Sequence, residues 1–192
     1  MDTKRLTALS LATVVAASAM VAPLSAAQPA ETCLDAPVAQ LASSGIGGTA
    51  RLCTSGSGTH ADMAAEKLTS GNAYTIWFVY FDNPTTCAAQ PCTGADALGD
   101  DPVAVFGRMD GVVADGTGAA RFSGDFHDLR LSQGSEVWLL MFGHGPANAE
   151  DNRARARQLL TPQSPKLGAP AAGAAADGEI GAGVARAVFS LP

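Results

Sequence analysis

Three histidines are the residues of this chain best suited to acid–base chemistry or metal binding. They are His60, His127 and His144, and each falls on a separate segment. Imidazole is a common ligand for copper and zinc, and Asp125 and Asp128 stand beside His127, where a carboxylate could orient the ring. Nothing in the spacing brings the three histidines together. The sequence therefore predicts no shared metal centre, and it predicts no cofactor.

The familiar catalytic signatures are missing from the sequence. It contains no G-x-S-x-G nucleophile elbow, no H-E-x-x-H zinc motif, no P-loop and no EF-hand loop. Asp96, Asp100 and Asp101 share a glycine-containing loop, but such acids are more often solvated than bound to calcium. Glu136 would serve as a general acid only if the fold buried and paired it.

Four cysteines, Cys33, Cys53, Cys87 and Cys92, make up an even set. Three pairings are possible, and we favour Cys87–Cys92 with Cys33–Cys53. The first pair would close a turn-rich loop that contains Pro91, and the second would tie down the N-terminal strand. A four-cysteine zinc site is disfavoured because the paired C-x₂-C spacing is absent. Disulfides indicate an oxidising compartment.

The first 27 residues are typical of a signal peptide. Lys4 and Arg5 precede a mostly apolar run from Leu6 to Leu24, and small residues end it at Ala27, near which we expect cleavage. Residues 28–192 would then form a single secreted domain, periplasmic or extracellular, with no membrane span. Loss of two basic residues and one acid changes the formal charge from −6 to −7, which disfavours nucleic acid as a partner.

The chain from residue 28 onward alternates short apolar runs with glycine, proline, aspartate and asparagine. This pattern predicts an all-β fold, an antiparallel sandwich or partly closed barrel of about seven strands with one short helix. The expected strands are Ala50–Cys53, Ala61–Leu68, Tyr74–Phe81, Val103–Val113, Ala119–Phe126, Glu136–Phe142 and Val184–Leu191. Turns at residues 69–72 and 115–118 are expected to close tight hairpins, because their glycines and asparagine tolerate positive φ.

One segment departs from this rhythm. Asn148, followed by acids and then by three arginines, predicts a short helix that ends before Pro162. We interpret it as a surface helix rather than an arginine-lined anion site, since residues on alternate positions point to different sides of a helix. The Pro/Ala/Gly-rich stretch at about 162–183 is expected to be a flexible excursion.

Two expected strands are apolar on both faces, Tyr74–Phe81 and Glu136–Phe142. A strand with one solvated face should alternate apolar and polar residues. The simpler explanation is that both strands are central and covered on both sides. The functional explanation is an aromatic-lined cavity or partner surface, which makes Tyr74, Phe78, Tyr80 and His144 the candidate ligand-binding residues.

A family resemblance covers roughly residues 60–147. It rests on the run from Leu68 to Trp77, the Asn83-Pro84 loop before Cys87, and the step Gly143-His144-Gly145-Pro146. These motifs resemble a group of uncharacterised secreted bacterial β-sandwich or barrel proteins, and more distantly the chordin-type (CHRD) domains. The CHRD pattern has a His-x-His step where this chain has Gly143, so the resemblance brings no paired-histidine site. It implies an extracellular all-β domain without established catalytic residues.

Two classes of function follow from these observations. We favour a secreted, non-catalytic binding or structural module, whose partner would be an unknown extracellular or periplasmic ligand or protein. The alternative is an exported metal-dependent or barrel-type enzyme that uses His127 or His144 with nearby carboxylates such as Glu136. The alternative requires these histidines to lie at one end of the fold.

Overall fold

Two antiparallel sheets make up the described part of the chain, and they are not closed into a barrel. The computed structural model describes residues 31–41, 45–98, 103–127, 129–147 and 183–192. The all-β sandwich prediction is confirmed. The expected signal peptide at residues 1–27, the helix after Asn148 and nearly all of the segment at about 162–183 lie outside the described residues.

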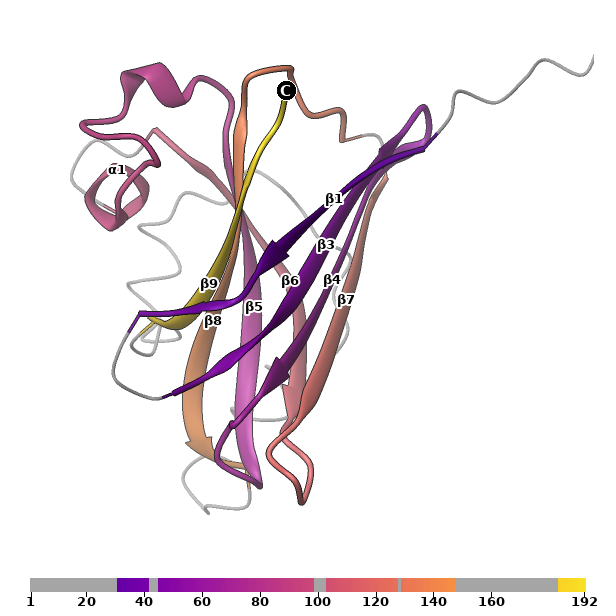
Figure 1. Ribbon diagram of the computed structural model, residues 1–192, viewed down its shortest axis with the longest axis vertical. Coiled ribbons are helices and arrows are strands. Elements are labelled where there is room, and N and C mark those ends of the chain that lie inside the picture. The colour runs from indigo at the N-terminus through magenta and orange to yellow at the C-terminus, as the bar shows by residue number, and fades with distance from the viewer. Residues whose placement is uncertain (1–30, 42–44, 99–102, 128, 148–182) are drawn as a thin grey trace, which may run out of the picture.

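Figure 1 shows the two sheets as layers whose strands cross at an angle. The four-stranded sheet has the order β1-β3-β4-β7 and consists of β1 (Thr32–Pro37), β3 (Gly47–Ser55), β4 (Gly58–Glu66) and β7 (Ala120–His127). The five-stranded sheet has the order β2-β9-β8-β5-β6 and consists of β2 (Ala39–Gln40), β9 (Gly183–Ser190), β8 (Glu136–Pro146), β5 (Asn72–Phe81) and β6 (Val105–Val113). Val38 separates β1 from β2, so the chain changes sheets there.

All seven expected strands are present, with ends shifted by a few residues. The two strands that were not expected, β1 and β2, are short and lie at the edges of their sheets. In β1 only Leu34 and Ala36 pack against the core, so the apolar alternation is too brief to identify a strand.

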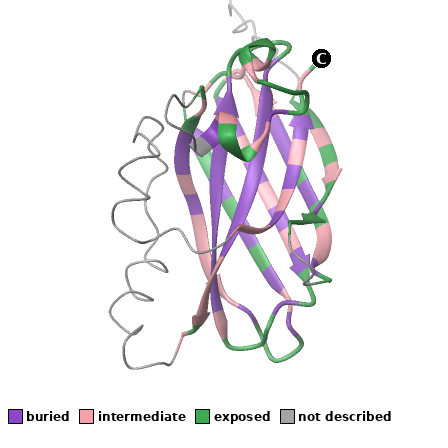
Figure 2. Ribbon diagram, turned by 90° about the vertical axis from the view of Figure 1, so that its left-hand side faces the viewer, coloured by how far each residue is buried: buried purple, intermediate pink, exposed green. Residues whose placement is uncertain are grey.

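The core between the sheets is formed by alternate residues of each strand. In β7, Phe122 and Phe126 are buried and point into the core. Between them, Ser123 and Asp125 are exposed, and Gly124 is buried. The rings of Phe126 and Phe78 on β5 have centroids 4.2 Å apart and join the two sheets. Each such buried side chain stabilises the fold by about 1.5–3 kcal/mol. Figure 2 shows the buried residues running along the strands of the sandwich.

A second apolar cluster lies on the other side of the five-stranded sheet, and we call it the apolar face. It consists of Trp77, Val79, Phe81, Phe106, Trp138, Leu140 and Phe142. Cys92 and Ala97 pack on it from the β5–β6 connection, which holds a 3₁₀ turn (Pro84–Thr86) and α1 (Gly94–Leu98). The two-faced pattern of β5 and β8 therefore marks central strands with apolar clusters on both sides.

The turns at residues 69–72 and 115–118 differ from the expected hairpins. Each carries the chain from one sheet to the other, β4 to β5 and β6 to β7. The two turns bind each other: the Leu68 amide donates to the Gly118 carbonyl (2.9 Å) and the Gly71 amide to the Ala114 carbonyl (3.0 Å). Gly118 has φ 76°, and a Cβ there would lie 2.4 Å from the Leu68 carbonyl oxygen. Glycine is thus required by both conformation and space.

Both favoured disulfides are present. Cys33–Cys53 joins directly opposite residues of β1 and β3, with the Cα atoms 4.0 Å apart. Cys87–Cys92 closes the loop that packs on the apolar face, with the Cα atoms 5.4 Å apart. None of the cysteines is free.

Candidate functional site

The three aromatic candidates lie inside the core rather than at a surface cavity. Tyr74, Phe78 and Tyr80 are at most 8% exposed and belong to the cluster between the sheets. The Tyr74 hydroxyl accepts a hydrogen bond from the Thr69 amide (3.0 Å), and the Tyr80 hydroxyl donates one to Asp82 Oδ1 (2.7 Å). Both hydroxyls therefore fix neighbouring loops.

The fourth candidate, His144, lies on the opposite side of the same sheet. Its Nε2 is 2.8 Å from the Thr75 hydroxyl, and Thr75 is fully buried. Because successive residues of β5 point to opposite faces, Thr75 cannot share a face with Tyr74. The structure therefore does not bring His144 together with the three aromatic residues.

The histidines of the enzyme alternative are also separated. His127 ends β7 in the four-stranded sheet, whereas His144 lies on β8 in the five-stranded sheet. His127 is exposed and pairs in register with Gly58. These two side chains do not meet at one end of the fold.

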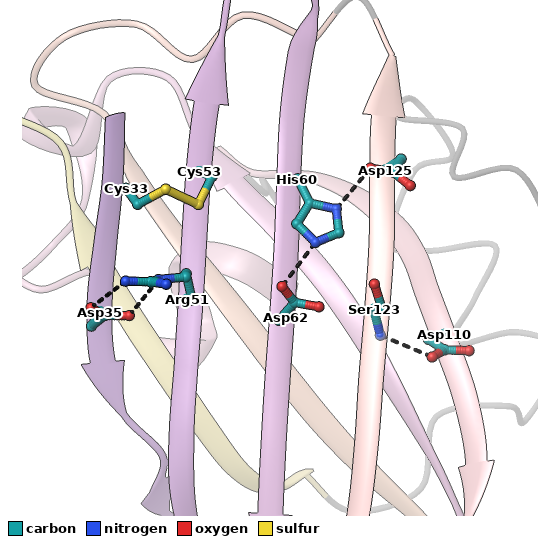
Figure 3. A network of polar contacts seen from close by, with 9 residues as sticks. All are labelled: Cys33, Asp35, Arg51, Cys53, His60, Asp62, Asp110, Ser123 and Asp125. Carbon is teal, nitrogen blue, oxygen red and sulfur yellow. Dashed lines mark hydrogen bonds and ion pairs between the residues drawn. A yellow bond between two sulfur atoms is a disulfide. The ribbon is translucent and has the colours of Figure 1, made fainter. Parts of the chain in front are cut away.

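The residues that do converge lie on the outward side of the four-stranded sheet (Figure 3), which we call the charged face. The strand register arranges its outward residues in rows. One row contains Cys33, Cys53, His60 and Asp125, and the next contains Asp35, Arg51, Asp62 and Ser123. A third row contains Pro37, Thr49, Ala64 and Arg121. Strand alternation places all of these side chains on one surface.

His60 is held between two carboxylates on this face. Its Nδ1 lies 2.7 Å from Asp125 Oδ1 on β7, and its Nε2 lies 2.8 Å from Asp62 Oδ2 on β4 itself. Partial burial lowers the pKa of His60, but the hydrogen bonds and charges of Asp125 and Asp62 together outweigh it. The pKa is therefore raised above its ordinary value of 6.5. An imidazole that binds a carboxylate at each nitrogen is suited to an ion-pair clamp rather than to general-base catalysis.

Two further interactions fix the positions of charged side chains on this face. Arg51 donates from Nε to Asp35 Oδ1 (2.9 Å) and from an Nη to Asp35 Oδ2 (3.2 Å). Asp110, on β6, accepts a hydrogen bond from the Ser123 amide (3.0 Å). In the described part of the chain β7 is an edge strand, so its Ser123 amide has no neighbouring strand to which it can donate. The Asp110 carboxylate accepts this hydrogen bond in place of a strand carbonyl.

An open hollow of about 520 Å³ lies among these groups, and we call it the Arg121 hollow. Its polar lining comes from Asp35, Thr49, Arg51, Asp62, Asp110, Arg121 and Ser123, and Ala64 belongs to its floor. Arg121 is exposed and has no hydrogen-bond or ion-pair partner in the part of the chain that the structure describes. The hollow thus presents one uncommitted cation.

A smaller hollow of about 230 Å³ lies near the first residues of β4. Its lining includes Glu31, His60, Asp125 and His127. Within the described ranges, the group of possible metal donors that lies close enough together is Glu31 with Cys33 and Cys53. The two sulfurs form a disulfide and offer no thiolate, so this donor set does not suit a metal ion.

Of the remaining acidic candidates, Glu136 and Asp96 are engaged in the fold, whereas Asp100, Asp101 and Asp128 lie outside the described residues. Glu136 is 4% exposed, and its Oε1 accepts hydrogen bonds from the Cys92 amide (3.0 Å) and Trp138 Nε1 (2.6 Å). It therefore anchors the disulfide loop to the apolar face. Asp96 accepts hydrogen bonds from the amides of Thr93 and Ala88, as a loop-capping residue does.

Sequence reasoning missed the His60 clamp and the Arg121 hollow. The available signal was a pair of short patterns at the ends of two expected strands, His60-Ala61-Asp62 and Asp125-Phe126-His127, in which each histidine lies one residue outside the expected strand. Alternate residues share a face, so each strand carries its acid and imidazole outward. Which residues face each other depends on the register, and that was not visible in the sequence.

Comparison with known proteins adds no relative. No protein-family model, curated protein or solved structure matches the chain. The fold defines the class by itself: a disulfide-linked antiparallel β-sandwich with a charged outer face on one sheet and an apolar outer face on the other.

Proposed function

We propose that this protein is a secreted, non-catalytic binding module that engages its ligand through the charged face. The observation that carries the proposal is the Arg121 hollow, which combines about 520 Å³ of open space with an uncommitted guanidinium. Ligand sites generally pair a concave surface with a few polar groups that orient the ligand. The hollow lies on paired strands, which hold side chains more rigidly than loops do.

The surrounding ion pairs support this role. Asp35 with Arg51 and His60 with Asp62 and Asp125 fix the positions of charged groups around the hollow. Ordered charges give a surface electrostatic complementarity and so select among ligands. The charged face is therefore suited to recognition more than to reaction chemistry.

Export is part of the same proposal. The two disulfides suit an oxidising compartment. In the described residues, no helix is long and apolar enough to cross a membrane. We also retain as a proposal the kinship with secreted bacterial β-sandwich proteins and CHRD-type domains, which rests on the motifs around Asn83-Pro84 and His144.

Amide chemical-shift mapping of the oxidised protein tests the binding role. The probes are amino acids, short peptides, polyamines and saccharides at millimolar concentration. We expect at least one probe to shift the amides of Arg51, Asp62 and Arg121 while leaving that of Trp138 in place. A panel that shifts only amides of the apolar face, or none on the charged face, would contradict the proposal.

The enzyme alternative receives no support from the placement of its residues. His127 and His144 belong to different sheets, and Glu136 is a buried hydrogen-bond acceptor for Trp138. We therefore propose the binding role alone.

A further inference from the structure

The Arg121 hollow has a composition that selects one kind of ligand, and this inference rests on the proposed binding role of the charged face. Three small or short side chains belong to its lining, Thr49, Ala64 and Ser123. Ala64 lies directly between Thr49 on β3 and Arg121 on β7 in the strand register. The short side chains leave space between longer charged ones, which explains why the sheet is hollowed here.

Most of the charged groups around the hollow are already committed. Arg51 binds both carboxylate oxygens of Asp35. Asp110 accepts hydrogen bonds from the amides of Gly111 (2.7 Å) and Ser123 (3.0 Å), one at each oxygen. The charge of Arg51 is thus offset by Asp35, and both oxygens of Asp110 are occupied, so these groups mainly shape the rim.

Two further charged groups are not paired with an opposite charge across the hollow. Arg121 has no partner among the described residues, and Asp62 is engaged through Oδ2 alone, by His60. Asp62 lies opposite Ser123, and Ala64 lies opposite Arg121, so Asp62 and Arg121 are diagonal neighbours on adjacent strands. Diagonal neighbours in an antiparallel pair are about 7–8 Å apart. None of the ion pairs among the described residues joins Asp62 to Arg121. The space between them suits a group that bonds to both.

A ligand that satisfies both groups needs an anionic end and a neighbouring donor. A guanidinium binds a carboxylate through two parallel hydrogen bonds, and a carboxylate accepts N–H donors. Amino acids and the carboxyl ends of peptides carry an amine or amide close to a carboxylate. We propose that the hollow binds the carboxylate end of an amino acid or peptide, with Arg121 holding the carboxylate and Asp62 accepting a hydrogen bond from the adjacent nitrogen.

Other ligand classes fit less well. A polyamine would meet Asp62 but would leave Arg121 without a partner, and Asp35 and Asp110 already accept hydrogen bonds. A sugar acid would satisfy Arg121, but none of the outward residues of these two rows offers an aromatic ring for stacking. They are Asp35, Arg51, Asp62, Ser123, Pro37, Thr49, Ala64 and Arg121. The free groups are all polar and close together, as a short polar ligand requires.

Isothermal titration calorimetry of the oxidised full-length protein tests the inference. The probes are acetyl-Ala-Ala with a free carboxylate, acetyl-Ala-Ala-amide, and glucuronate. We expect the free acid to bind at least about tenfold more tightly than the amide, because a charge-assisted bidentate pair is lost. R121A should weaken binding of the free acid by about tenfold or more, and D62N by a smaller factor.

Arg186→Gln is the matched control. Arg186 lies over the Trp138 ring in the five-stranded sheet, 4.4 Å from its centroid, so its loss should leave affinity unchanged. Circular dichroism of each variant establishes that it is folded. Conservative R121K should retain part of the affinity, since lysine keeps the charge but not the planar fork.

Several results would overturn the inference. Equal affinity for the acid and the amide, or unchanged affinity in R121A, would exclude the carboxylate contact. Binding of glucuronate without binding of the peptide acid would assign the hollow to a different ligand class. If amide shifts still map to the charged face in either case, the binding role stands. If no probe of any class shifts amides of that face, the proposed function itself fails.

Discussion

The two outer faces of this sandwich are built by the same alternation of residues but reach opposite results. On the charged face, neighbouring strands carry His60, Asp62 and Asp125, which bind one another in the open. On the apolar face, Trp138 is 1% exposed and Phe81 is fully buried, with ring centroids 4.8 Å apart. The difference teaches that one outer face adds buried apolar contacts to the fold, while the other leaves charged groups accessible, as the proposed binding role requires.

The sharpest test of this division is Trp138→Ala. The substitution removes a large side chain that packs on Phe81 and lies beneath Arg186, and it leaves Glu136 without one of its buried donors. We expect a loss of about 3–5 kcal/mol in the free energy of unfolding, measured by urea denaturation. Ser123→Ala on the charged face is the control, expected to change stability by about 0.5 kcal/mol or less. Similar losses in both variants would abolish the contrast.

The next largest effect on the free energy of unfolding is expected from removal of a disulfide. One disulfide lies on the charged face and the other in the loop that packs on the apolar face, so their removal compares the two faces. The Cys33–Cys53 disulfide joins residues that are 20 positions apart in the sequence, and the Cys87–Cys92 disulfide joins residues that are 5 apart. Replacing both cysteines of a pair by alanine opens the corresponding loop. The chain-entropy account predicts losses of about 3 and about 2 kcal/mol, respectively. Thermal and urea unfolding of the two double variants measure both. The reverse order would mean that packing of Cys92 in the apolar face outweighs loop entropy.

A smaller effect is expected from pH. The pKa of His60 is raised above 6.5 in the folded protein by Asp125 and Asp62 against the effect of burial. The protonated ring is therefore favoured by folding: its contribution is fully present below about pH 6.5 and is lost as the pH rises through the folded pKa. His60→Gln should remove this slope in the free energy of unfolding. NMR titration of the His60 ring checks the direction, and a midpoint below 6.5 would contradict the clamp.

The smallest effect is expected from Arg51→Ala. The ion pair with Asp35 is solvent exposed, with side-chain exposures of 56% for Arg51 and 68% for Asp35. Exposed pairs contribute about 0–1 kcal/mol, so urea denaturation should detect little change. A loss comparable to that of Trp138→Ala would show that the charged face is structural and would weaken its assignment as a binding surface.

The sequence predicted the sandwich well because alternation and turn residues are local. Seven strands follow from such patterns, and the turn-rich loop around Pro91 favoured the disulfide pairing that the structure has. By contrast, β1 has too few apolar residues and β2 too few residues of any kind. The turns at Gly71 and Gly118 were recognised as turns, but their role as crossings between sheets depends on which strands pair.

The candidate site was harder to predict for the same reason. Tyr74 and Tyr80 looked available because the sequence does not say which side of a central strand faces the opposing sheet. Asp125 was expected to serve His127, its neighbour in sequence, but the register places it across from His60. Both outcomes depend on which strands pair and in which register. The alternation of apolar and polar residues does not carry that information.

The position of Cys33 has a mechanical consequence. It is the second residue of β1 and is bonded covalently to β3. A force that pulls on Thr32 would meet this cross-link after one residue and pass directly into β3, rather than peeling β1 from the sheet hydrogen bond by hydrogen bond. The edge strand is thereby protected against unzipping from its exposed end, the end at which tension on the N-terminal side of the chain would arrive.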